Sequence, residues 1–297
     1  MDPQVLNELQ RLKKRTSITT LISIILFVLV VVIGFIRPGE HIIAFFGLLV
    51  VSIILTGINN KRYSAYYKEH VVKNMTLEQC DFLDDLQFET DAGISEYEVM
   101  DLGVLHGDRF RSNDLITAKY KGVFFRQSDV YIGDVERDSD GDTHEYTVFQ
   151  GRWMIFEFNK DFNWDMQVVT KNFTSANRLG GILSFGKKKT QKIELEDEAF
   201  NKAFRVFAQD EHEAFYILTP HIMEALLSLK TQLKSPIMLV FKGGMLHVAV
   251  NNGKDAFEGK IFGKFDINED KARLLNDLKL ITDFVDLLSL ERDIYKY

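Results

Sequence analysis

The sequence predicts an α+β protein: an N-terminal two-helix transmembrane hairpin, followed by a cytoplasmic mixed α+β body with mainly antiparallel strands. Three observations support this class. Two long apolar segments lie in the first 60 residues, alternating strand patterns follow Asn113, and helical periodicity returns in the last hundred residues. We expect three regions: a hairpin at 1–60, juxtamembrane helices and first strands at 61–145, and a C-terminal α+β lobe with a long terminal helix at 146–297.

The hairpin prediction depends on segment length and on the absence of charge. Thr16–Ile36 has 21 residues and none is ionisable. At ~1.5 Å per residue it is about 31 Å long, which matches a ~30 Å hydrocarbon core. The second segment extends uncharged over 42–60, and the short connection contains Pro38 and Gly39, which favour a turn. A cleaved signal peptide is disfavoured because the first alanine is Ala44.

The charged flanks predict the orientation of the hairpin. Basic residues tend to stay on the cytoplasmic side of a membrane. They lie before the first span and after the second, whereas the connection carries only Arg37. We therefore expect a multi-pass protein of the cytoplasmic membrane with both termini in the cytoplasm, which contacts the lipid bilayer through residues 16–60. The flanking residues are Arg11, Lys13, Lys14, Arg15, Lys61, Arg62 and Lys68.

Composition excludes several classes of protein. The whole chain has a formal net charge of −7. Residues 1–58 contain five basic and three acidic side chains, so the remaining 31 basic and 40 acidic side chains give the body a net charge of −9. This acidity argues against nucleic acid as the main partner. Cys80 is the only cysteine, which excludes internal disulfides and cysteine-rich metal sites, and no cofactor is indicated.

The first half of the body is expected to contain helices and then strands. The apolar spacing over 61–78 predicts a helix, Thr76 with Gln79 is typical of a capping box that restarts a short helix, and Gly93–Met100 predicts another. Tight turns are expected at Lys121-Gly122 and at Ser128-Asp129. Period-two alternation predicts strands at 115–120, 122–127, 130–135, 145–149, 153–159 and 166–171.

The last hundred residues mix both periods. Helices are expected at 197–204 and 220–233, a strand at 215–218, and a hairpin of 237–241 with 246–250 around Gly243-Gly244. A long terminal helix, capped by Asn268, has an apolar stripe that either packs on the sheet, as we favour, or forms a seam with a partner. The stripe consists of Leu274, Leu275, Leu278, Ile281, Val285 and Leu288.

Several segments resemble a known bacterial family. They begin at Asp108-Arg-Phe-Arg-Ser-Asn-Asp-Leu, Phe149-Gln-Gly-Arg-Trp-Met-Ile-Phe, Leu195-Glu-Asp-Glu-Ala-Phe-Asn-Lys and Ala214-Phe-Tyr-Ile-Leu-Thr-Pro-His. With these motifs the chain resembles the membrane-anchored family catalogued as domain of unknown function 3137, sometimes mislabelled galanin. The resemblance covers most of the chain, the two spans included. It implies a bacterial membrane protein without an established activity, and it transfers no catalytic residues.

Three local motifs were compared with known sites. Asp138, Asp140 and Asp142 alternate as at the start of a calcium loop, but the sixth and twelfth positions are Thr143 and Phe149 instead of glycine and glutamate, so a solvated turn is favoured. His221 and Glu224 lie one helical turn apart, as half a metal site does, and a solvent-facing helix start is favoured. The segment Gly181–Lys188 is similar to a P-loop but ends in lysine instead of serine or threonine.

These patterns favour a non-enzymatic role. No catalytic, cofactor-binding or metal residue is assigned, and Asp138, Asp140 and Asp142 are the candidates for an ion site. We expect a membrane-tethered interaction or scaffold module that forms a homo-oligomer or a complex with another membrane protein. The alternative is an enzyme or a ligand- or ion-responsive sensor that uses a cleft in the body, for which several titratable groups would have to converge on one pocket.

Overall fold

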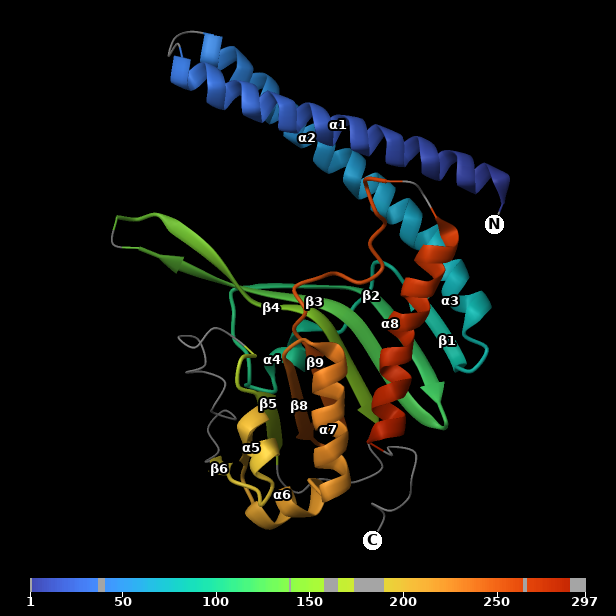
Figure 1. The fold of residues 1–297 in the computed structure, drawn as a ribbon, viewed down its shortest axis with the longest axis vertical. Helices are drawn as coiled ribbons and strands as arrows, with labels where there is room; N and C mark the ends of the chain where they lie inside the picture. The colour runs from blue at the N-terminus through green and yellow to red at the C-terminus, as the bar shows by residue number, and fades with distance from the viewer. Residues whose placement is uncertain are drawn as a thin grey trace. The chain divides into compact units, whose positions relative to one another are not determined.

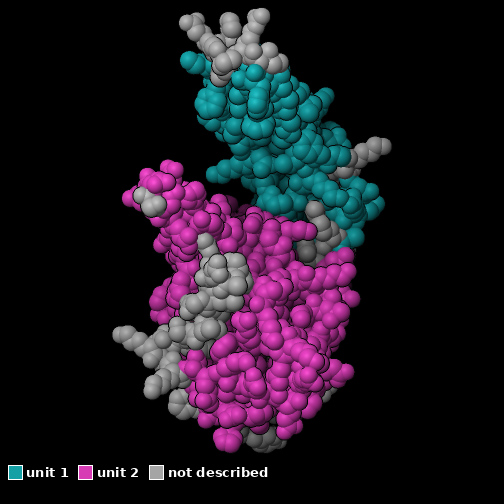
Figure 2. All heavy atoms as spheres, turned by 60° about the vertical axis from the view of Figure 1, so that its left-hand side comes forward, with its two compact units in different colours: residues 1–78, 257–274 teal, residues 79–256, 275–297 magenta. Residues whose placement is uncertain are grey.

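The computed structural model describes residues 2–36, 41–138, 140–157, 165–173, 190–263 and 266–288. The chain divides into two compact units, and it passes between them three times. Unit 1 consists of residues 1–78 and 257–274, and unit 2 of residues 79–256 and 275–297 (Figure 2). Two long apolar N-terminal helices and a nine-stranded antiparallel sheet with helices confirm the predicted α+β class.

Unit 1 is built on two long helices that lie side by side (Figure 1). They are α1 (Pro3–Ile36) and α2 (His41–Tyr67), and they contain the two predicted spans. Both are long and apolar enough to cross a membrane. The predicted turn at 37–40 lies outside the described residues. The large apolar side chains on these helices are mostly exposed, because neighbouring protein covers little of them.

Small hydroxyl side chains lie between the two helices. The Ser23 hydroxyl is hydrogen-bonded to that of Ser52 and lies 3.0 Å from that of Thr56. Asn59 donates a 3.5 Å hydrogen bond to Thr19. Polar and small residues at such positions allow helices in a membrane to approach closely. In this chain they pack the hairpin against itself.

The predicted restart of the helix at Thr76 is wrong. From α2 the chain continues through a π-helical segment η1 (Lys68–Val72) into α3 (Lys73–Gln79) without a break. The Thr76 hydroxyl donates to the carbonyl of Val72 one turn earlier, which is a bond of the helix interior and not of a cap. Residues after α3 form a strand, β1, that the sequence pattern did not predict.

Unit 2 contains the sheet, whose strand order is β1-β2-β3-β4-β9-β8-β5-β7-β6 with antiparallel pairing throughout. The strands are β1 (Asp84–Glu89), β2 (Arg109–Tyr120), β3 (Val123–Arg137), β4 (Thr143–Glu157), β5 (Met166–Thr170), β6 (Gln191–Ile193), β7 (Phe204–Ala208), β8 (Ile237–Lys242) and β9 (Met245–Val250). The predicted hairpin at Gly243-Gly244 is confirmed as β8–β9.

The predicted turn at Ser128-Asp129 is also wrong. Both residues lie inside the single long strand β3, where they pair with Trp153 and Arg152 of β4. Polar residues are tolerated there because their side chains have partners: Ser128 accepts from the backbone N–H of Ile94, and Asp129 from that of Ala256. A pair of polar residues thus continues the strand instead of ending it.

Five helices accompany the sheet: α4 (Glu96–Met100), α5 (Glu198–Ala203), α6 (Glu211–Ile217), α7 (Pro220–Leu233) and α8 (Ile267–Leu287). The helix predicted at 220–233 is confirmed, with Thr219 as its N-cap. The strand predicted at 215–218 is wrong: these residues end α6, which begins because Asp210 accepts from the Glu213 N–H. Asp266, and not Asn268, caps α8 by accepting from the N–H groups of residues 268 and 269.

The two faces of the sheet are covered by different elements. Trp153 and Ile155 of β4 pack in a core with Ile94 and Val99 from the α4 segment. Phe156 faces the opposite way and meets Phe284 of α8, with ring centroids 6.4 Å apart. Figure 1 shows α7 and the unit 2 part of α8 in front of the sheet and α4 behind it. The apolar stripe of α8 is therefore core: its members Leu274, Leu278, Ile281, Val285 and Leu288 are buried, together with Phe284.

This packing predicts the effect of a charge on α8. Ile281→Asp should lower the free energy of unfolding of the body by roughly 3–5 kcal/mol, because it buries an uncompensated carboxylate. Lys279→Asp changes an exposed position of the same helix and should cost far less. Chemical denaturation of the full chain in detergent, followed by near-UV circular dichroism, measures both. A folded Ile281→Asp protein that only loses a partner would contradict the core assignment.

Candidate functional site

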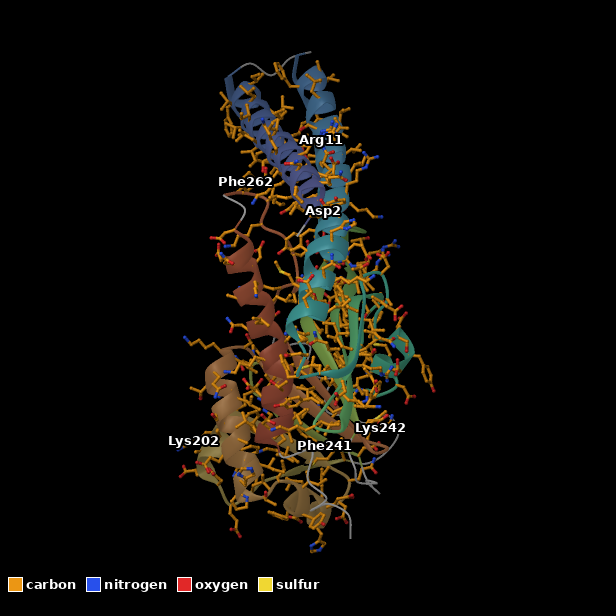
Figure 3. All side chains as sticks on the ribbon, turned by 90° about the vertical axis from the view of Figure 1, so that its right-hand side faces the viewer. Asp2, Arg11, Lys202, Phe241, Lys242 and Phe262 are labelled. Carbon is orange, nitrogen blue, oxygen red and sulfur yellow. The ribbon has the colours of Figure 1, made fainter. Side chains whose placement is uncertain are left out.

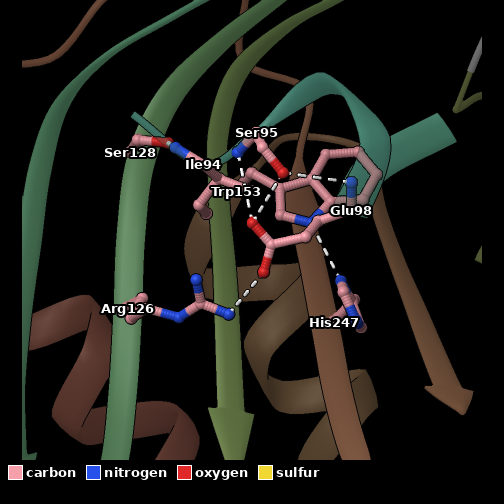
Figure 4. Close-up of polar contacts among 7 residues, drawn as sticks. All are labelled: Ile94, Ser95, Glu98, Arg126, Ser128, Trp153 and His247. Carbon is pink, nitrogen blue, oxygen red and sulfur yellow. Dashed lines mark hydrogen bonds and ion pairs between the residues drawn. The ribbon is translucent and has the colours of Figure 1, made fainter. Parts of the chain in front are cut away.

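A partly buried polar cluster lies on the α4 face of the sheet and consists of Glu98, Arg126, Trp153 and His247 (Figure 4). Strand register brings three of them together. Arg126 of β3 is opposite Ile155 of β4, and Ile155 is opposite His247 of β9. Trp153 lies two residues along β4 and therefore points to the same face. The fourth member, Glu98, comes from α4.

The Glu98 carboxylate joins the start of α4 to β3. One oxygen, Oε2, accepts from the Ser95 hydroxyl at 2.8 Å and from the Ser95 N–H at 3.3 Å, while the Ser95 Oγ accepts from the Glu98 N–H. These bonds form a capping box. The other oxygen, Oε1, accepts from Nη2 of Arg126 at 2.6 Å. Helix start and strand are thus held by one side chain.

The backbone just before α4 is docked on two serine hydroxyls of the sheet. The N–H of Ile94 donates to Ser128 Oγ at 3.1 Å, and Ser112 Oγ lies 2.9 Å from the same atom. The approach is close, since a Cβ on Gly93 would lie 2.2 Å from the Ser112 hydroxyl oxygen. Glycine is therefore required at this position if the segment is to stay seated on β2 and β3.

The surroundings of Glu98 and His247 determine their protonation states near neutral pH: Glu98 is ionised and His247 is neutral. Burial alone would raise the pKa of Glu98, but hydrogen bonds from Arg126 and Ser95 outweigh it, and the pKa is lowered. Burial lowers the pKa of His247 to about 4. The negative charge of Glu98 raises this pKa, and the positive charges of Arg126 and Lys242 lower it further. His247 is thus a neutral imidazole, whose Nδ1 accepts from Trp153 Nε1 at 3.3 Å.

These contacts determine what the cluster can do chemically. An ionised carboxylate held by a guanidinium is a weak base, and the pKa of His247 is too low for proton transfer near pH 7. Trp153 and His247 are buried, whereas Glu98 and Arg126 keep about a third and a quarter of their side chains exposed. The arrangement is suited to fixing α4 on the sheet, with one charged edge at the surface.

A second buried charged group lies on the opposite face of the sheet. Asp129 of β3 and Arg152 of β4 are directly opposite each other in the register, and Asp114 lies at a bulge of the neighbouring strand β2. Burial raises the pKa of Asp129 to about 7; Arg152 opposes this shift, and Asp114 and Asp255 add to it. A buried carboxylate with such a pKa takes up a proton near neutrality.

The predicted ion-site candidates lie in the turn between β3 and β4. Asp138 uses its carboxylate for the turn itself: Oδ1 accepts from the N–H groups of Asp140 and Asp142, and Oδ2 lies 3.2 Å from His144 Nε2. The hydrogen bond with His144 lowers the pKa of Asp138. Desolvation opposes this shift, and the hydrogen bonds from backbone N–H groups add to it. Across the described ranges, no three His, Cys, Asp or Glu side chains are grouped to hold a metal ion.

The other two motifs are placed differently. His221 and Glu224 are both exposed in the first turns of α7. The segment Gly181–Lys188 lies outside the described residues. The two motifs that lie in the described residues, Asp138–Asp142 and His221 with Glu224, belong to neither polar cluster.

The residues of the buried clusters were not identified from the sequence. One local signal was present, because Ser95-x-x-Glu98 is the pattern of a capping box. The sequence offers no comparable signal for Arg126, Trp153 and His247. They are brought together only by the β3–β4–β9 register, in which β9 is distant in sequence.

The two pKa shifts predict opposite pH dependences. Between pH 6.5 and about 4, His247 is protonated in the unfolded state and neutral in the folded state. His247 therefore lowers the free energy of unfolding as pH falls, by at most about 1.4 kcal/mol per pH unit. Between pH 3.8 and about 7 the folded state holds a proton on Asp129, so Asp129 removes stability as pH rises. Relative to wild type, His247→Asn should gain stability towards pH 4 and Asp129→Asn towards pH 7.

Chemical denaturation of wild type and both variants across pH 4–8 measures these slopes. Each asparagine retains an amide oxygen as an acceptor, so the comparison isolates the titration. Parallel profiles for all three proteins would show that neither group is held with a shifted pKa.

Comparisons with known proteins give a family and one distant structural likeness. Residues 147–290 match the model described as protein of unknown function (DUF3137), and three of the four quoted motifs lie in this range. None of the curated proteins matches the chain. Among solved structures, the chain is similar to the mycobacterial trehalose monomycolate transport factor A, TtfA, at 10% identity and a TM-score of 0.40, over 74% of this chain and 93% of that one. The resemblance is confirmed over residues 147–290, which form a DUF3137 domain; the segment from Asp108 and the two apolar helices lie outside the matched range.

Proposed function

We propose that this protein is a membrane-tethered interaction module. The α1–α2 hairpin crosses the cytoplasmic membrane of a bacterium with both ends inside. The sheet body then binds another copy of the chain or another membrane protein at the cytoplasmic surface. The observation that carries the proposal is the apolar exterior of the two helices.

The exterior of the hairpin supports the tether. In the hairpin, polar hydroxyls lie between the two helices, where Ser23 is hydrogen-bonded to Ser52 and to Thr56. Its outer surface consists of large apolar side chains, such as Phe27, which is 58% exposed. Side chains of this kind are stable in lipid, and helices satisfy their own backbone hydrogen bonds there. The flanking charges described above favour cytoplasmic ends.

The two polar clusters support binding over catalysis. The acidic and basic groups that register brings together serve to hold α4 and the strands, as the Glu98–Arg126 pair does. Features of the surface instead resemble those of interaction sites. Phe215 and Tyr216 are adjacent on α6 and are 41% and 49% exposed, and Tyr97 on α4 is 77% exposed. Aromatic side chains are enriched where proteins meet.

The structure changes the basis of the expected association. The stripe of α8 was a candidate contact surface, but it packs within the chain. We place the contact with a partner on the exterior of the body. The exposed pair on α6 is the surface that we assign to it.

This assignment predicts the result of a matched pair of variants. Phe215→Ser combined with Tyr216→Ser should weaken the assembly by about tenfold or more, since each 1.4 kcal/mol of lost contact is a factor of ten. Tyr146→Ser removes an exposed aromatic residue on β4 and should leave the assembly intact. Mass measurement of the complex released from native membranes in mild detergent reports both. A wild-type protein that is monomeric, partnerless and active on a small molecule would defeat the proposal.

A further inference from the structure

A returning segment of the chain runs along the base of the hairpin within unit 1. Glu258 accepts from the Ser64 hydroxyl at 2.8 Å, and its other oxygen lies 2.8 Å from Lys68 Nζ. Further along, the Tyr63 hydroxyl donates to the carbonyl of Lys260 at 3.1 Å. The successive partners lie earlier and earlier in α2, so the segment ascends the helix towards its apolar part.

The fit of this segment against α2 is close. A Cβ on Gly259 would lie 2.7 Å from the Tyr63 hydroxyl oxygen and 3.0 Å from the Tyr67 ring. Both tyrosines are buried. The position therefore requires glycine, and the path of the segment is fixed by packing as well as by hydrogen bonds.

The segment reaches α1 at the start of its charge-free stretch. The Ser17 hydroxyl donates to the carbonyl of Ile261 at 2.6 Å. Ser17 is the second residue of Thr16–Ile36. Further along the chain, Asp270 of α8 interacts electrostatically with Lys13, which lies about one turn before Ser17. Residues 261–263 are therefore the described part of the segment that reaches furthest along the hairpin.

The side chain at this tip is apolar and uncovered. Phe262 is 54% exposed, and Figure 3 shows it on the loop beside α1. Two carboxylates of this region are paired with lysines, Glu258 with Lys68 and Glu269 with Lys260, and Asp266 accepts from N–H groups at the start of α8. Anionic lipid headgroups would repel free carboxylates, and aromatic side chains favour the boundary between headgroups and hydrocarbon.

We propose that residues 261–263 form a third membrane contact, in which Phe262 enters the interfacial layer of the bilayer beside the first span. The inference rests on the proposed hairpin in the membrane and goes beyond it. Phe262 follows Ile261, whose carbonyl accepts from Ser17, so lipid that surrounds the first span at Ser17 would also reach the Phe262 side chain. No other partner is then needed to cover it. The contact fixes residues 257–263, which directly follow the sheet body, at the membrane surface.

Spin labels on the full chain in vesicles of phosphatidylcholine and phosphatidylglycerol test this contact. Phe262→Cys, Val28→Cys and Leu77→Cys are labelled in separate proteins, and collisions with oxygen and with a water-soluble nickel complex are compared. Val28 lies in the first span and serves as the control for lipid. Leu77, an exposed apolar residue of α3, serves as the control for water, because it lies roughly 27 Å along the helix from Asn59 at ~1.5 Å per residue. Wild type serves as the blank, because burial raises the pKa of Cys80 to about 11 and the thiol labels poorly.

The expected result is a ratio of oxygen to nickel collisions at Phe262 that is severalfold higher than at Leu77 and lower than at Val28. A water-like ratio at Phe262 with a lipid-like ratio at Val28 would overturn the third contact and leave the tether standing. Low collision with both reagents at Phe262 would show that protein covers it, which also overturns the proposal. A water-like ratio at Val28 would remove the tether and this inference together.

Discussion

The constraint on which this structure depends is the apolar exterior of the α1–α2 pair. Twenty large hydrophobic side chains between Ile18 and Ile58 are exposed on the two helices. Fully burying one such side chain is worth roughly 1.5–3 kcal/mol, so leaving the set in water would cost tens of kcal/mol. A lipid phase removes this cost, and the helices bring no unsatisfied backbone groups into it. The placement of charge at the ends and of hydroxyls between the helices is consistent with that environment.

The hairpin is also tied to the C-terminal part of the chain. Unit 1 includes residues 257–274, so the unit that contains the two candidate membrane helices is formed by segments that lie far apart in the sequence. Lys68 shows why this matters: its side chain is 9% exposed and pairs with Glu258. Removing the first 60 residues would leave segment 257–263 without part of its support, such as the Ser17 hydroxyl. A chain truncated at the hairpin is therefore an altered protein and not simply a soluble version of the body.

Sequence patterns predicted the elements whose signals are local. The two spans follow from uninterrupted apolar runs, and α7 from its Thr219-Pro220 start and apolar face. Sequence patterns gave wrong predictions where contacts with residues outside the segment determine the secondary structure. Ser128-Asp129 has the composition of a turn, but buried partners keep it in a strand. Phe215–Leu218 has strand composition, but a cap at Asp210 makes it the end of a helix.

The polar clusters show the same limit more strongly. Glu98 could be found through its capping box with Ser95, which is written in four consecutive residues. Its ion pair with Arg126 depends on the packing of α4 against β3, and the contact of Trp153 with His247 depends on the pairing of β4 with β9, which are far apart in the chain. A pattern in one sequence contains no such register. Physical reasoning could therefore predict the class of fold and the two long apolar helices, while the composition of the clusters required the structure.

The most direct test of this account is a pair of reporter fusions that are active on opposite sides of the membrane. One reporter is active only outside the cytoplasm and the other only within it, and each is placed at Tyr297 and in the connection after Ile36. We predict that the cytoplasmic reporter is active at Tyr297 and the external reporter in the connection, because the hairpin crosses twice with its basic ends inside. External activity at Tyr297, or cytoplasmic activity at the connection, would contradict the tethered arrangement.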